Sequence, residues 1–371
     1  MVLKQFEYLS IKEKAVLGRY VVNGQIDGFL EKFKDKYEVK TLGVSVLGLP
    51  IRSITLGSGP IKVLMWSQMH GNESTTTKAV LDLINYLDSD LPKAETVRKN
   101  CSITIIPILN PDGAVVYTRV NANAVDLNRD AQQRTQSESR ALRSAFDELQ
   151  PDYCFNLHDQ RTIFNVGDTS KPATISFLAP AHDEIRSVSP ARSLSMKLIV
   201  AMNTMLQKQI PGQIGRYDDA FNADCVGDTF QMTGTPTVLF EAGHHPDDYD
   251  RERTREYIFQ ALITALNMIV VEAVLELNES DYFLIPENQK RYYDILIRNA
   301  HIIVPSLKKG DAIGILYVET LNNKTIDFVP KIEKIGSLDS YYGHKTYNCL
   351  IDSDLKSLEK YSALTDLFSA F

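Results

Sequence analysis

Four short apolar runs, separated by helical patterns, constrain the fold of this 371-residue chain most strongly. They occupy residues 61–66, 102–109, 153–157 and 235–240. Continuous apolar runs of this kind are typical of strands in a sheet that is covered on both faces. Helical patterns occupy residues 74–88, 137–149, 190–209 and 251–278. The alternation predicts an α/β fold, in which a mostly parallel mixed sheet has helices on both faces.

The two ends of the chain have different patterns. Residues 1–40 have the spacing of an amphipathic helix, and residues 44–59 have that of two short strands with turns. After Pro286 the sequence changes to short alternating segments separated by turn residues, which predicts a β-rich unit. We therefore expect a large domain over residues 1–285 and a small β-rich accessory domain over residues 286–371.

Composition and charge exclude several classes of protein. Hydrophobic residues make up 44% of the chain and charged residues 23%, which excludes wholesale disorder. The net charge of −7 argues against a broad nucleic-acid-binding surface, because such a surface needs a basic patch. No stretch approaches the roughly 18 consecutive apolar residues of a membrane-spanning helix. We expect neither a nucleic-acid nor a membrane partner.

The N-terminal segment and the cysteines both favour a cytoplasmic protein. Charged residues interrupt the first 20 positions, so we expect no secretory signal there. The four cysteines are Cys101, Cys154, Cys225 and Cys349. They are far apart and form no C-x-x-C pair. We expect buried free thiols in a reducing compartment rather than a disulfide framework or a cysteine zinc site.

A polar cluster follows each of the four apolar runs. The clusters are SQMHGNE from Ser67, NPDG from Asn110, HD from His158 and EAGHH from Glu241. In open α/β sheets, ligands bind outside the carboxyl ends of the strands. If the four strands are parallel neighbours, all four clusters converge on one crevice.

The first cluster contains His70 and Glu73 in the spacing H-x-x-E, which is weak when it stands alone. The alternative is a capped turn at a helix N-terminus. The metal interpretation gains weight because His158 follows another strand and supplies a third ligand. Two histidines and one carboxylate with an open fourth position are typical of a catalytic zinc site.

A second group of polar residues lies between the second and third runs. The NPDG segment by itself favours a turn. The later run DLNRD is harder to explain as a loop, because an arginine such as Arg129 can hold a carboxylate bidentately and Asn128 adds a donor. Asp126 could accept a hydrogen bond from the non-ligating nitrogen of a zinc histidine.

The segments MHGNE, NPDG, TRVNANAVDLNRD, NLHD and VLFEAGH, in this order, resemble the zinc carboxypeptidase family (the M14 metallocarboxypeptidase type). The resemblance covers roughly residues 40–275 and leaves the last 85 or so residues unmatched. It implies one zinc ion per chain. The implied zinc ligands are His70, Glu73 and His158. It also implies that Glu241 is the catalytic glutamate. His244 and His245 do not fit the three-ligand pattern of the family, and we expect them to lie beside the zinc site without binding the ion.

The resemblance implies further roles for the residues that precede the third strand. Arg119 matches the arginine that polarises the scissile carbonyl, and Asn128 with Arg129 matches the pair that grips the C-terminal carboxylate of the substrate. Asp126 matches the residue that braces the first zinc histidine. Tyr217 is the nearest candidate for the mobile active-site tyrosine of the family, although no motif fixes it; the alternative is a surface tyrosine.

These assignments imply a zinc-dependent carboxypeptidase. It would hydrolyse the amide bond next to a free C-terminal carboxylate, using a zinc-bound water and a glutamate general base. Its partner would be a peptide or a small amide with a free carboxylate. One alternative is an N-acyl amino acid deacylase of the aspartoacylase or succinylglutamate desuccinylase type, which shares the motif order and carries a C-terminal β domain. The other is a non-catalytic zinc-dependent binding protein.

Overall fold

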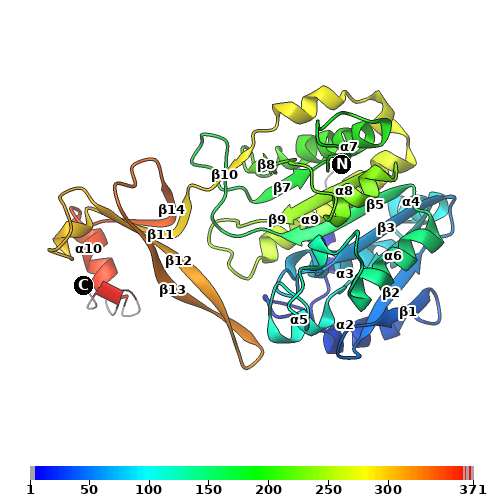
Figure 1. The fold of residues 1–371 in the computed structure, drawn as a ribbon, viewed down its shortest axis with the longest axis horizontal. Helices are drawn as coiled ribbons and strands as arrows, with labels where there is room; N and C mark the ends of the chain where they lie inside the picture. The colour runs from blue at the N-terminus through cyan, green and yellow to red at the C-terminus, as the bar shows by residue number, and fades with distance from the viewer. Residues whose placement is uncertain (1–4, 362–363, 365–366, 369–371) are drawn as a thin grey trace.

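The central sheet has eight strands, and the four apolar runs form its middle. Figure 1 shows the computed structural model of the chain, which describes residues 5–361, 364 and 367–368. The strand order is β1-β2-β4-β3-β5-β9-β7-β8. The strands are β1 Glu38–Val44, β2 Pro50–Leu56, β3 Ile61–Ser67, β4 Cys101–Ile106, β5 Tyr153–Asp159, β7 Ile175–Leu178, β8 Ile214–Arg216 and β9 Thr237–Ala242. Because β4, β3, β5 and β9 are parallel neighbours, the predicted mixed sheet with a parallel centre is confirmed.

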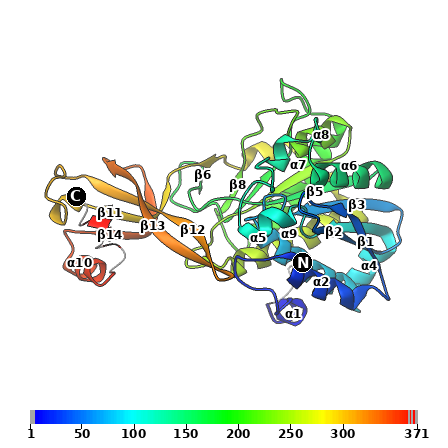
Figure 2. The ribbon, with the colours of Figure 1, turned by 60° about the horizontal axis from the view of Figure 1, so that its bottom comes forward.

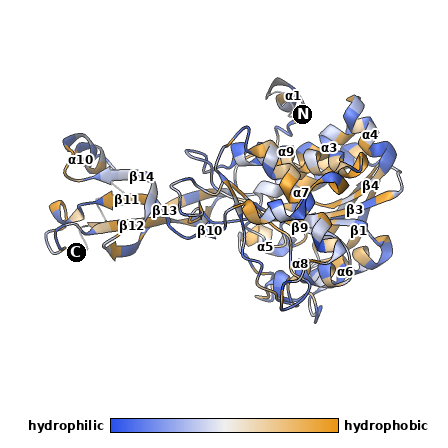
Figure 3. Cartoon of the chain, turned by 90° about the horizontal axis from the view of Figure 1, so that it is seen from above, coloured by the Kyte–Doolittle hydropathy of each residue, from blue (hydrophilic) through white to orange (hydrophobic). Residues whose placement is uncertain are grey.

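Helices cover both faces of this sheet, as predicted. They are α3 Thr75–Asp88, α4 Pro92–Asn100, α5 Pro111–Val116, α6 Ser137–Leu149, α7 Pro190–Leu206, α8 Val226–Met232 and α9 Glu252–Val270. Successive side chains of β3 point to opposite faces. Val63 and Met65 therefore join the core beneath α3, α4, α7 and α9, whereas Leu64 and Trp66 join a second core beneath α6 and α8. Hydrophobic colour gathers in this interior in Figure 3.

Two of the predicted helices end earlier than their periodicity indicates. The helix α7 ends at Leu206, and α9 ends at Val270. After α9 the chain turns, because Glu272 has a φ of 54°, in the left-handed region that breaks a helix. The chain continues in 3-10 turns. The 3-10 turns of the chain are η1 Glu31–Phe33, η2 Leu127–Arg129, η3 Ala273–Glu276, η4 Glu279–Leu284 and η5 Ala300–Ile302. Among the described residues, no helix is both long and apolar enough to cross a bilayer.

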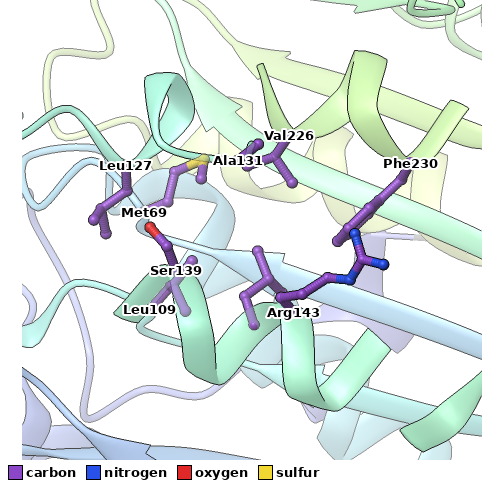
Figure 4. A pocket seen from close by; sticks show the side chains of 9 residues that line it. Met69, Leu109, Leu127, Ala131, Ser139, Arg143, Val226 and Phe230 are labelled. Atoms are coloured by element: carbon purple, nitrogen blue, oxygen red, sulfur yellow. The ribbon is translucent and has the colours of Figure 1, made fainter. Parts of the chain in front are cut away.

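The second core contains a small gap that is part of its packing. Figure 4 shows the side chains around it, which come from the segments after β3 and β4, from η2 and the loop after it, and from α6 and α8. The gap measures about 10 Å³, and its lining is mostly apolar. The rings of Phe146 and Phe230 stack beside it with centroids 4.0 Å apart. A space of this size is at the lower limit for one water molecule, so it does not serve a substrate.

The expectation of one helix over the first 40 residues is wrong. The chain forms α1 Gln5–Ile11 and α2 Asn23–Leu30, with an irregular segment between them. The buried guanidinium of Arg255 explains this segment, because it donates to the carbonyl oxygens of Glu13 at 2.7 Å and Val16 at 2.8 Å. Backbone carbonyls that bind a side chain in this way are withdrawn from a helix ladder.

The C-terminal residues form a separate small sheet, as predicted. Its strands are β11 Tyr292–Arg298, β12 Ala312–Asn322, β13 Thr325–Gly336 and β14 Tyr342–Asn348, in the order β13-β12-β11-β14, and α10 Asp352–Glu359 follows them. The preceding strand β10 Asn288–Gln289 instead pairs with β6 Asn165–Val166. The chain thus passes from the large body to the small sheet after β10 (Figure 1).

The long hairpin of β12 and β13 returns to the large body. Figure 2 shows it running toward the N-terminal segment. Glu319 on β12 forms an ion pair with Arg19 at 3.1 Å and accepts a hydrogen bond from the hydroxyl of Tyr117. The small sheet is therefore tied to the large body through Arg19 and Tyr117.

Candidate metal centre and cleft

The loop after β3 packs backbone against backbone on the start of α5. A side chain at Gly71 would place its Cβ only 2.0 Å from the carbonyl carbon of Gly113. Asn110 accepts a hydrogen bond from the N–H of Gly113 at 2.9 Å and donates to the carbonyl of Met69 at 3.1 Å. The NPDG segment is thus the capped start of a short helix, and it holds the loop that carries His70.

His70, Glu73 and His158 form one buried cluster whose possible ligand atoms all lie within 4.8 Å of one another. The Glu73 carboxylate lies 2.8 Å from His70 Nδ1 and 2.9 Å from His158 Nδ1. The two Nδ1 atoms are 3.2 Å apart. Two facing imidazole nitrogens and one carboxylate are a donor set that suits zinc. Burial alone would raise the pKa of Glu73, but the two histidines beside it lower that pKa below its usual value. The ionised carboxylate that a metal requires is therefore favoured.

Asp126 fixes the orientation of the first histidine. Its Oδ1 lies 3.0 Å from His70 Nε2 and accepts a hydrogen bond from the N–H of Asn128. An N–H at Nε2 that donates to Asp126 leaves Nδ1 free to bind a metal. The other oxygen of Asp126 accepts from Nε of Arg119 at 3.0 Å, and Nη1 of Arg119 lies 3.3 Å from Glu73.

Glu241 is the register partner of His158 on the adjacent strand β9. Its Oε2 is buried and has no hydrogen-bond partner among the described residues. Burial raises the pKa of Glu241 well above its usual value, and the nearby carboxylates of Glu73 and Asp159 add to this effect. A buried carboxyl oxygen without a protein partner is available to a substrate or a water molecule.

A cleft of about 630 Å³ joins these residues, and we call it the metal-site cleft. Its lining includes His70, Glu73, Arg119, Asn128, Arg129, His158, Tyr217 and Glu241. Every site residue expected from the sequence therefore lines one cleft, except Asp126, which lies behind His70. Three of the four strand-end clusters therefore meet at this cleft as expected, whereas the NPDG cluster does not line it and instead packs against the loop that carries His70.

The carboxylate-gripping candidates lie along one wall of this cleft. The side chain of Asn128 accepts from the N–H of Val226 at 3.0 Å, which fixes it. Arg129 donates to the Asn128 carbonyl at 2.7 Å and to the sulfur of Cys225 at 3.2 Å. Tyr217 is half-buried, and its ring packs on Phe164 at 5.3 Å between centroids. Among the described residues all four cysteines are free; three are buried as expected, and Cys225 is half-buried.

Asp228 lines the same cleft but carried no signal in the sequence, where it is one acid in the segment VGDTF. It is buried near the N-terminus of α8, and burial raises the pKa of its carboxyl to about 7. His244 lies outside the metal cluster, where its ring packs on His344 at 4.2 Å and on Tyr249 at 4.5 Å.

A second cavity of about 380 Å³ adjoins the metal-site cleft. The two share Glu73, Arg119, Asp159, Gln160 and Arg161. The remaining wall is built partly by the hairpin of β12 and β13, and we call this space the hairpin cavity. Sequence reasoning did not find it, because Arg19 and Glu319 are 300 positions apart and belong to no motif.

Comparisons with known proteins identify a family that matches this chain. The family profile described as zinc carboxypeptidase (peptidase M14) matches residues 22–209. Carboxypeptidase SOL1 from Arabidopsis thaliana is 29% identical over 124 residues, which is 30% of this chain and 25% of that protein. Carboxypeptidase 2 from Trichophyton rubrum is 27% identical over 100 residues, which is 26% of this chain and 19% of that protein. The chain thus spans a quarter or less of the length of these two curated relatives.

Solved structures show the same fold. The metallo-carboxypeptidase from Burkholderia cenocepacia has a TM-score of 0.55 at 20% identity, over 68% of this chain and 69% of that chain. Carboxypeptidase A from Helicoverpa armigera has a TM-score of 0.52 at 18% identity, over 70% and 75%. The family match covers half of the sequence, the fold agrees, and the buried His-Glu-His cluster lies where the strands end. This chain belongs to the zinc carboxypeptidase family.

Proposed function

We propose that the chain is a zinc-dependent carboxypeptidase that hydrolyses the amide bond next to a free C-terminal carboxylate. The observation that carries this proposal is the shared cleft. A metal-binding triad, a buried carboxyl group without a protein partner and an arginine beside an asparagine all line it. Amide hydrolysis at a chain end needs these three functions within reach of one another.

The triad of His70, Glu73 and His158 would hold the zinc ion. When bound, zinc supplies a water of lowered pKa, a Lewis acid for the carbonyl, and a positive charge that favours the ionised form of Glu241. Glu241 accepts the proton of the attacking water and returns it to the leaving nitrogen. Arg119 offers a guanidinium to the carbonyl oxygen as negative charge develops there.

Selection of the chain end falls to Asn128 and Arg129. The guanidinium of Arg129 can hold a carboxylate through two parallel hydrogen bonds, and Asn128 can donate a third. Tyr217 lines the same cleft, and its hydroxyl can donate to a substrate carbonyl or carboxylate. Asp126 keeps His70 oriented through the hydrogen bond at Nε2.

A second candidate function is N-acyl amino acid deacylation, and one observation favours it. The hairpin of β12 and β13 contributes a wall to the cavity beside the metal site. A deacylase holds only a short acyl group, so a bounded cavity suits it well. A carboxypeptidase for long chains needs an open path there.

The experiment that separates the two candidates is a comparison of substrates with the zinc-loaded protein. Blocked dipeptides and longer peptides with a free C-terminus are measured beside N-acetyl-aspartate and N-succinyl-glutamate. We expect a peptide to be hydrolysed at least as well as the acyl amino acids. Hydrolysis of the acyl amino acids alone would replace the carboxypeptidase by the deacylase, and turnover of neither class would contradict both.

A further inference from the structure

The hairpin cavity has two walls of different origin. Arg19, Tyr117 and Asp159 come from the large body, whereas Tyr317, Val318, Glu319 and Phe328 come from β12 and β13. The cavity meets the metal-site cleft at Glu73 and Arg119. Arg129 and Asn128 line only the metal-site cleft, so a substrate that they grip and that extends past Glu73 and Arg119 would place its acyl side in the hairpin cavity.

An ion pair fixes the hairpin against the large body. Glu319 lies 3.1 Å from two guanidinium nitrogens of Arg19, whose side chain is only 5% exposed. The hydroxyl of Tyr117 donates to the same carboxylate. Burial opposes ionisation, but Arg19 lowers the pKa of Glu319, so the carboxylate is charged at neutral pH. Arg19 is buried and Glu319 is half-buried, so separating this doubly bonded ion pair would leave the charge of Arg19 buried without its partner.

An aromatic cluster packs on the hairpin next to this ion pair, since Phe328 is the cross-strand partner of Glu319. The ring of Tyr249 lies 5.2 Å from that of Tyr317 and 5.1 Å from that of Phe328. The hydroxyl of Tyr249 donates to Asp294 on β11 at 2.9 Å, and Asp294 also accepts from the N–H of Tyr317 at 2.8 Å. Aromatic contacts of this kind add to the burial of the rings. The hairpin is therefore a packed wall rather than a free arm.

The size of the cavity limits what can occupy it. A sphere of about 380 Å³ is about 9 Å across, a length that an extended chain spans with roughly two to three residues at about 3.4 Å each. The volume is at the lower end of the range of small-molecule sites. A longer acyl side would have to leave past the hairpin or displace it.

We propose that the β12–β13 hairpin is a length-selecting wall, which restricts the enzyme to short peptides whose acyl side ends within the hairpin cavity. The inference rests on the proposed function and narrows its substrate class to peptides of a few residues, as opposed to proteins. It assigns the C-terminal sheet a role in specificity, while the groups that react with the substrate stay in the large body.

The test is a length series with the zinc-loaded full chain. Blocked peptides of two, three, five and ten residues share the same two C-terminal residues, so the scissile bond is identical in all of them. We expect kcat/KM for the ten-residue peptide to be lower than for the best short peptide by about 10-fold or more. A kcat/KM that is constant or rises with length overturns the inference and leaves the carboxypeptidase intact. Turnover of no peptide of any length contradicts the proposed function, and the inference fails with it.

Two variants connect the effect to the hairpin. One replaces residues 319–328 by a two-residue Asn-Gly turn, which joins the cross-strand partners Val318 and Val329. The other is Phe328→Ala, which enlarges the cavity without removing the ion pair of Glu319. The matched control is Thr320→Ala, an exposed position on β12 that does not line the cavity.

The shortened hairpin should raise kcat/KM for the ten-residue peptide by about 10-fold and change that for the dipeptide by less than about 3-fold. Phe328→Ala should shift the length profile in the same direction by a smaller factor, and it serves as the test if the shortened chain does not fold. Thr320→Ala should leave the profile unchanged. Variants that change every length by the same factor, or a control that shifts the profile as much as Phe328→Ala, overturn the inference.

Discussion

His158 and Glu241 are direct register partners on the neighbouring parallel strands β5 and β9. A candidate zinc ligand and the candidate general base are thus positioned by the backbone ladder of the sheet itself. A shift of the pairing by one residue would send one of the two side chains to the opposite face. Their relative placement therefore depends on the strand pairing at the parallel centre of the sheet.

The first prediction concerns the metal. His158→Ala should remove most of the bound zinc, because His70 and Glu73 are the two ligands that remain in the described cluster. Metal analysis of the purified variant measures this directly. The matched control is His182→Ala, which lies outside the cluster and should keep one zinc per chain. Full zinc occupancy in the His158 variant would exclude that residue from the site.

The second prediction concerns the general base. Glu241→Gln should keep zinc and lower kcat by roughly 10²–10⁴-fold, since the amide retains the shape of the side chain but does not accept the proton. Metal content and kcat are measured on the same sample. Loss of zinc together with activity would make Glu241 a ligand instead.

The third prediction concerns the backbone contact between two loops. Gly71→Ala should lower the free energy of unfolding by about 1–3 kcal/mol and reduce zinc content, because its Cβ would collide with the backbone of Gly113. Gly24→Ala in α2 is the control, since nothing lies within 4 Å of its Cβ. That change should alter stability by no more than about 1 kcal/mol, in the stabilising direction. Equal stability of both variants would show that the two loops can separate freely.

The sequence contained enough information for the parallel centre and for the residues that line one cleft beside it. A continuous apolar run indicates a strand buried on both faces, and the polar residues after it mark the end of that strand. Both features can be recognised from the local sequence. The spacing of His70 and Glu73 is local, and the loop that carries them begins where β3 ends. His158 and Glu241 could be joined to this pair because strand ends of a parallel sheet meet at one edge.

The features that the sequence did not reveal depend on long-range contacts. The first 40 residues have helical spacing, but Arg255 binds the carbonyls of Glu13 and Val16 from more than 200 positions away. The same applies to the pair of Arg19 and Glu319, which brings the hairpin to the cleft. Such contacts add no periodicity to either segment, so local patterns do not predict them.

The fourth prediction concerns the pH dependence of stability. Burial raises the pKa of Asp228 from 3.8 to about 7 in the folded chain. Between these values the folded state keeps a proton that the unfolded state has lost, so this carboxyl stabilises the fold at low pH and loses that contribution as pH rises toward 7. The free energy of unfolding of Asp228→Asn minus that of the parent should therefore be larger at pH 8 than at pH 5. We expect the change to be about 1–4 kcal/mol.

Denaturant unfolding of both proteins at the two pH values, with a chelator present throughout, measures this difference. Groups other than Asp228 titrate alike in the two proteins, so their contributions cancel. The exposed Asp224→Asn change is the control and should show the same difference at both pH values. A larger advantage for the Asp228 variant at pH 5 than at pH 8 would reverse the sign of the argument.

The central claim is that the chain recognises a free C-terminal carboxylate, and the most direct measurement compares one blocked dipeptide in its free-acid and amidated forms. The account predicts hydrolysis of the free acid and a kcat/KM for the amide lower by roughly 30-fold or more, which corresponds to the loss of at least about 2 kcal/mol from one charge-assisted pairing with Arg129. In Arg129→Ala this preference should disappear, and in the control Arg134→Ala, outside the cleft, it should persist. Equal hydrolysis of the two forms by the parent protein would contradict the account.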